Sequence, residues 1–104
     1  MLNQKIRQFL VHSFLYYKLD ESIISDTEYD SLCVELKGLI KDKSNFIYEE
    51  LIQSSMGKES SGFSIRNYPP EIVSASFHLL YQEKYKTNKS FDAFVKQYGY
   101  QINS

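Results

Sequence analysis

The sequence predicts an all-α domain of four or five helices, built on an antiparallel helical hairpin at its N-terminus. Apolar residues recur every three or four positions in several segments, which is the period of one helix face. No segment shows a convincing strand pattern, because the best candidate, residues 63–65, is too short to build a sheet. The 104 residues are 42% hydrophobic and 24% charged, which suits a single globular domain over residues 1–104.

The predicted hairpin occupies residues 3–43. Its first helix spans about residues 3–18 and its second residues 26–40, with a turn from Asp20 to Ile24 between them. Ser25 at the N-cap and Glu28 three residues later form a capping box that starts the second helix. The expected apolar faces are Ile6, Phe9, Leu10, Phe14 and Tyr17 in the first helix, and Tyr29, Leu32, Cys33, Leu36, Leu39 and Ile40 in the second. Because the connection is short, the two faces are expected to pack against each other.

Residues 44–104 are predicted to form a helical extension that covers the apolar face of the hairpin, because two helices alone could not bury that face. Ser44 and Ser90 are expected to cap the third and fifth helices, and prolines to start the fourth. Gly99 is expected at the C′ position that ends the last helix. The predicted helices span about residues 45–53, 69–85 and 91–98.

A flexible loop is predicted over residues 54–64, because this segment is rich in Ser and Gly and lacks periodic apolar residues. It contains the dipeptide Gly57-Lys58, which also occurs in phosphate-binding loops. That motif requires a glycine five positions before Gly57, where this chain has Ile52. The sequence therefore favours a plain loop.

Composition limits the classes of function. The net charge is −1, with 12 basic and 13 acidic residues, so direct nucleic-acid binding is not favoured. The single cysteine, Cys33, cannot form an internal disulfide and is expected to be a buried thiol in a reducing compartment. No segment is long enough to span a membrane and no signal peptide is visible, so a cytoplasmic location is expected. His12 lacks a second ligand at metal-binding spacing, which predicts a solvated histidine and no metal site.

The candidate functional residues lie at the two ends of the turn. Asp26, Tyr29 and Asp30 share one face of the second helix, and Tyr16 and Tyr17 arrive from the end of the first. Carboxylates and phenol rings at a helix N-terminus would suit a cationic ring joined to a ribose. The alternative is structural: tyrosines of the core, and Asp26 as a favourable first-turn acid. That alternative leaves Asp30 unexplained, because an acid four residues after Asp26 is destabilising.

These residues belong to a longer pattern, which reads Tyr16-Tyr17-Lys18-Leu19-Asp20, then Ser25-Asp26-Thr27-Glu28-Tyr29-Asp30, then Leu32 through Glu35-Leu36. The pattern resembles the N-terminal domain (domain Ia) of bacterial NAD-dependent DNA ligases, over about residues 3–40. In that family the domain closes over the nicotinamide mononucleotide (NMN) half of NAD. The resemblance implies that NAD or NMN is the ligand and that its nicotinamide and ribose contact Tyr16, Tyr17, Asp26, Tyr29 and Asp30.

The chain departs from the ligase pattern in ways that bear on activity. Ser22 stands where the family usually has a proline, and the Ser-Pro-Thr-Gln linker to the nucleotidyltransferase domain is not recognisable. No Lys-x-Asp-Gly occurs among the 104 residues, so the lysine that would accept AMP is missing. The resemblance therefore implies the nucleotide-binding lid of a ligase without its adenylation chemistry.

Three functions of different classes follow. The first is a non-catalytic NAD- or NMN-binding module. The second is an interaction or inhibitor protein, of the phage accessory or anti-defence type, whose hairpin docks on a host ligase or another NAD-using enzyme. The third is catalysis with Asp30 as a base, which is favoured least because no nucleophile–base pair or set of metal ligands is visible.

Overall fold

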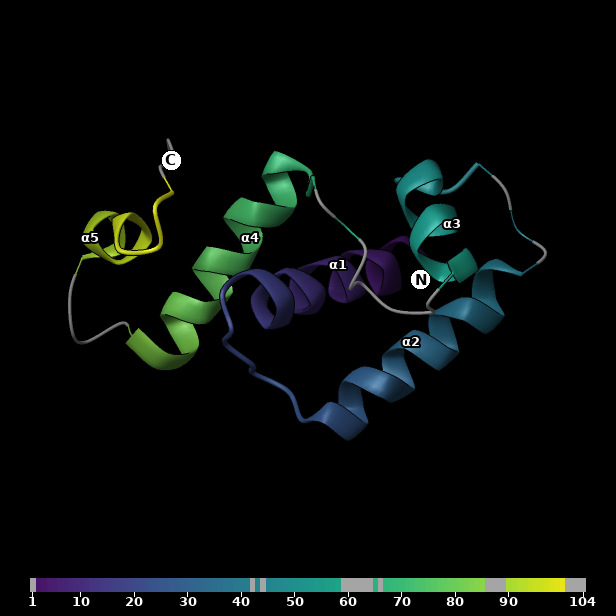
Figure 1. Cartoon of the computed structure of the whole chain (residues 1–104), viewed down its shortest axis with the longest axis horizontal. Coiled ribbons are helices and arrows are strands. Elements are labelled where there is room, and N and C mark those ends of the chain that lie inside the picture. The colour runs from purple at the N-terminus through teal and green to yellow at the C-terminus, as the bar shows by residue number, and fades with distance from the viewer. Residues whose placement is uncertain are drawn as a thin grey trace.

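The computed structural model confirms the all-α prediction. It describes residues 2–41, 43, 45–58, 65, 67–85 and 90–100, and this part of the chain contains helices and turns but no strand. The elements are α1 (Leu2–Lys18), α2 (Asp26–Ile40), α3 (Glu49–Lys58), α4 (Pro70–Leu80), the π-helical turn η1 (Tyr81–Tyr85) and α5 (Phe91–Lys96). Figure 1 shows α1 at the centre, with α2 and α3 on one side and α4 and α5 on the other.

Helices α1 and α2 form the predicted antiparallel hairpin. Lys5, near the start of α1, pairs with Glu35 in the second half of α2, with 2.9 Å between Nζ and Oε1. Ser13, further along α1, shares a hydrogen bond of 2.6 Å between its Oγ and the hydroxyl of Tyr29 in the first half of α2. Because the later residue of α1 meets the earlier residue of α2, the two helices run in opposite directions.

Local signals set both ends of the interhelical connection. Asp20 adopts a left-handed φ of 54°, which short polar side chains tolerate and which ends a helix. The backbone N–H of Glu21 then donates to the carbonyl of Leu15 at 2.9 Å. The predicted capping box is present, since Ser25 Oγ accepts from the Glu28 N–H at 3.1 Å and Glu28 Oε1 accepts from the Ser25 N–H at 3.0 Å.

The prediction for α3 was wrong at both ends. Its predicted start at residue 45 lies four residues before the observed one at Glu49, because Asn45 and Tyr48 have φ values of 59° and 55° that an α-helix cannot contain. Residues 54–58, predicted as loop, are helical and continue from the fully buried Ile52. Ser and Gly cost a helix only about 0.5–1 kcal/mol each relative to Ala, so an anchored helix can include them. The cap predicted at residue 44 and the loop predicted over residues 59–64 lie outside the described residues.

The C-terminal helices follow the prediction closely. Helix α4 starts at Pro70, and its helical path continues to Tyr85 through the wider turn η1. Helix α5 is capped by Ser90, whose Oγ accepts from the N–H of Ala93 at 3.3 Å. Gly99 has a φ of 80° and ends the turn after α5, the conformation expected of a glycine that follows a helix.

Helix α1 is the centre of the core because it packs against α2 on one side and α4 on the other. It therefore buries more than the single face that the sequence predicted. Val11 and Leu15, which lie outside the predicted face, are buried as well. The ring of Phe14 meets that of Phe77 in α4 at 5.8 Å, and Phe77 meets Phe94 in α5 at 6.0 Å. Helix α4 thus packs on the first helix of the hairpin, and α5 packs on α4.

Among the helices of the described residues, none is both long and apolar enough to cross a membrane.

Candidate functional site

Three tyrosines from the ends of the two hairpin helices form one cluster. The ring centroids of Tyr16 and Tyr17, in the last turn of α1, are 4.7 Å apart. The ring of Tyr29, in the first turns of α2, lies 5.9 Å from Tyr16 and 6.2 Å from Tyr17. Tyr16 is 39% exposed whereas Tyr29 is only 7% exposed. The cluster therefore has an outer aromatic surface, which Tyr16 presents, and an inner layer.

Tyr29 forms that inner layer. Its ring stacks on Phe9, with centroids 6.4 Å apart and ring planes at 16°, and its hydroxyl shares a buried hydrogen bond with Ser13. Reasoning from the sequence missed this partner, although the signal was available. Ser13 follows Phe9 by four residues and Ile6 by seven, so all three lie on one face of α1. Ser13 holds the ring against which Tyr16 and Tyr17 rest.

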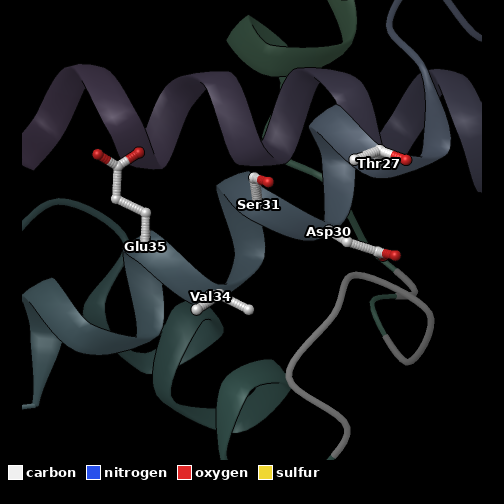
Figure 2. Close-up of a pocket in the computed structure, with 5 residues that line it drawn as sticks. All are labelled: Thr27, Asp30, Ser31, Val34 and Glu35. Carbon is white, nitrogen blue, oxygen red and sulfur yellow. The ribbon is translucent and has the colours of Figure 1, made fainter.

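Asp26 and Asp30 are both exposed in the first turns of α2, where the positive end of the helix dipole favours carboxylates. Asp30 lines an open pocket of about 600 Å³ together with Thr27, Ser31, Val34 and Glu35. Figure 2 shows Asp30 pointing outward from α2, while Glu35 points toward the start of α1. None of the three tyrosines lines this pocket. The structure thus gathers the tyrosines into one cluster and leaves the two acids on the solvent side of α2.

A second pocket, of about 410 Å³, lies between α1 and α2, and His12 is one of the residues that line it. The sequence predicted a solvated histidine, but His12 is half-buried in the wall of this pocket. Its Nδ1 is buried and has no hydrogen-bond partner among the described residues. Burial lowers the pKa of His12 below the usual 6.5, and the nearby carboxylate of Glu28 opposes this effect. The interior of the hairpin therefore favours the neutral imidazole.

The lowered pKa of His12 predicts a pH-dependent stability. The unfolded chain takes up a proton as the pH falls through the usual histidine value of 6.5, while the folded chain resists it. Because the unfolded state then binds more protons, the free energy of unfolding is expected to fall as the pH drops from 8 to 5.5. Urea unfolding across this range should show a smaller fall in His12→Gln than in the unmodified chain. The prediction is wrong if the two pH profiles are parallel, because the carboxylates are common to both proteins.

The described residues offer neither a reactive thiol nor a set of metal ligands. Cys33 is buried, as predicted, and burial raises the pKa of its thiol, which disfavours the reactive thiolate. Within the described part of the chain, no group of three or more His, Cys, Asp and Glu side chains could hold a metal ion.

The fold and the site together define an all-α protein whose N-terminal hairpin presents tyrosines and carboxylates around its interhelical turn. Comparison with known families agrees with the resemblance inferred from the motif. Residues 1–50, just under half of the chain, match the family model described as DNA ligase-like, N-terminal NAD⁺-binding domain. A search of curated proteins finds no match, and a search of solved structures finds none either. The resemblance to domain Ia of NAD-dependent ligases therefore rests on the hairpin and its motif.

Proposed function

We propose that this chain is a non-catalytic module that binds NAD or NMN through the nicotinamide and ribose. The observation that carries the proposal is the contact of Tyr16, Tyr17 and Tyr29 at the interhelical turn. Asp26 and Asp30 are exposed in the first turns of the helix that carries Tyr29. The match of residues 1–50 to a ligase-like NAD⁺-binding domain supports it.

The chemistry of each group suits a different part of the ligand. The oxidised nicotinamide ring is cationic and planar, so it can lie against the exposed face of Tyr16. The carboxylates of Asp26 and Asp30 accept hydrogen bonds from ribose hydroxyls and attract the pyridinium charge. Tyr29 supports the outer rings from within the core. The roles given to Tyr16, Asp26, Asp30 and Tyr29 therefore agree with how exposed each of them is.

The charges at the start of α2 also orient the ligand. The capping box uses Ser25 and Glu28, and Glu28 adds a third negative charge to those of Asp26 and Asp30. These acids repel a phosphate group that would otherwise be attracted to a helix N-terminus. The phosphate of NMN is therefore expected to point away from α2, with the nicotinamide and ribose facing it.

Binding without catalysis is the form of the proposal that the residues favour. Adenylation would need a lysine nucleophile in its motif, and Lys-x-Asp-Gly does not occur in the 104 residues. The size of NMN also sets an upper limit on its affinity. At about 0.3 kcal/mol per non-hydrogen atom, the roughly 22 such atoms of NMN would gain about 7 kcal/mol, or a Kd near 10 µM.

A thermal-shift titration with NMN, NAD, AMP and ADP-ribose tests the proposal. NMN at about 100 times its Kd adds about 2.7 kcal/mol to the free energy of unfolding, which for a domain of this size raises Tm by on the order of 10 °C. NMN and NAD should raise the Tm, whereas AMP, which lacks nicotinamide, should leave it unchanged. Equal shifts with AMP and NMN, or no shift with any of the four compounds, would show that no nicotinamide site exists.

A second candidate function is docking on a partner protein, and the surface of α2 favours it. Val34 is 74% exposed and lines the open pocket with Thr27, Asp30, Ser31 and Glu35 (Figure 2). An apolar side chain among polar ones can anchor a small protein interface. Titration with a purified bacterial NAD-dependent DNA ligase tests this role. Binding that Val34→Arg abolishes would support docking, and an absence of binding would leave the nucleotide module.

A further inference from the structure

Side chains from the C-terminal half of the chain bond to the loop between α1 and α2, mainly at the carboxylate of Glu21. The hydroxyls of Tyr85 and Tyr98 donate to the same Oε2 of Glu21, at 2.8 Å and 3.3 Å. Lys84 Nζ lies 3.5 Å from Oε1 of Glu21 and donates to the carbonyl of Ser22 at 3.1 Å. We call these five residues the Glu21 clamp.

The two phenols are the principal donors of this clamp. The side chain of Glu21 is 21% exposed and that of Lys84 is 41% exposed, so the ion pair between them is well solvated and contributes little. Hydrogen bonds from neutral hydroxyls to a carboxylate are shorter and stronger than those between neutral groups. The bond to Glu21 is also the main reason that the pKa of Tyr85 is raised above its usual 10. The neutral phenol of Tyr85 is thus the stable donor.

The loop held by the Glu21 clamp connects the ends of the two helices that carry the proposed ligand site. Residues 19–25 join Tyr16 and Tyr17 to Asp26, and they lack regular structure. Glu21 lies directly after Asp20, whose left-handed φ ends α1. A loop of this kind can adopt many conformations unless tertiary contacts select one. The clamp supplies such contacts from segments more than sixty residues further along the chain.

We propose that the Glu21 clamp positions the NMN site: it keeps Tyr16 and Tyr17 in one fixed placement relative to Asp26 and Asp30. This inference rests on the proposed function. A preorganised loop raises affinity because the ligand need not select a minor conformation. Glu21, Tyr85 and Tyr98 are therefore positioning residues, and the C-terminal half contributes to binding without touching the ligand.

The test compares two hydroxyl deletions in the C-terminal half. Tyr85→Phe removes a donor to Glu21 and keeps the ring, whose centroid lies 4.9 Å from that of Phe94. It is expected to raise the Kd for NMN about tenfold, which corresponds to about 1.4 kcal/mol. Amide hydrogen exchange of loop residues 21–25 should become faster, while the middle of α2 is unchanged. Tyr100→Phe removes a hydroxyl from a ring that packs on Phe14 and Phe77 and should change neither quantity.

Glu21→Gln adds an internal check. It removes the charge but keeps an acceptor, so both effects should go in the same direction as in Tyr85→Phe and be smaller.

The outcomes separate this inference from the proposed function. If the unmodified chain binds NMN and Tyr85→Phe binds equally well, the positioning role is overturned while the binding function stands. Equal loop exchange in Tyr85→Phe and Tyr100→Phe would show that the clamp does not order the loop. If the unmodified chain fails to bind NMN, the proposed function fails first, and the positioning role fails with it.

Discussion

Asp30→Asn is expected to weaken NMN binding about 10- to 100-fold without lowering the stability of the fold. A hydrogen bond to a charged group contributes about 1.5–3 kcal/mol, and each 1.4 kcal/mol is a factor of ten in Kd. Asp26 and Asp30 are like charges four residues apart on α2, a destabilising arrangement. Removing one of them should therefore leave Tm unchanged or raise it slightly. Isothermal titration with NMN and a thermal melt of the same protein measure the two effects.

Asp92→Asn is the matched control for this change. Asp92 is an exposed acid in the first turn of α5, so the substitution removes the same charge at a helix start that does not carry the tyrosine cluster. Its NMN affinity should equal that of the unmodified chain. If Asp30→Asn binds NMN as tightly as Asp92→Asn does, Asp30 is not part of a nucleotide site.

Phe77→Ala is expected to lower the free energy of unfolding by about 3–5 kcal/mol, the usual cost of deleting a fully buried phenylalanine. Phe77 is 0% exposed and its ring joins Phe14 of α1 to Phe94 of α5. The total stability of a domain of this size is typically about 5–15 kcal/mol, so a large part of it depends on this ring. Urea unfolding followed by far-UV circular dichroism measures the loss.

Val34→Ala provides the comparison for Phe77→Ala. Val34 is 74% exposed in the middle of α2, and exposed substitutions usually change stability by less than about 0.5 kcal/mol. If both variants unfold at the same urea concentration, the C-terminal half does not share a cooperative core with the hairpin.

The long-range placement of several residues could not be predicted, because it depends on elements distant in sequence. Val11 and Leu15 are buried because α1 lies between α2 and α4 and so has two packed faces. The late start of α3 follows the left-handed φ values of Asn45 and Tyr48. The hydroxyl of Tyr48 donates to Glu71 at 2.5 Å. Burial, together with this bond, raises the pKa of Tyr48 to about 12.

Features that depend on neighbouring residues could be predicted from the amino-acid sequence. The start of α2 was predicted because the capping box of Ser25 and Glu28 acts within one helical turn. The ligase-like pattern from Tyr16 to Asp30 was likewise visible from residue types and spacing, and the family comparison agrees with it.

The contacts between distant parts of the chain became visible with the packing of the helices in the tertiary structure. This packing buried Tyr29 against Ser13, left Asp30 at the surface and brought Tyr85 and Tyr98 to Glu21. Helix periods and caps are set by hydrogen bonds a few residues apart, so local sequence encodes them. Contacts between distant segments depend on how all the helices pack together, and local sequence does not specify that packing.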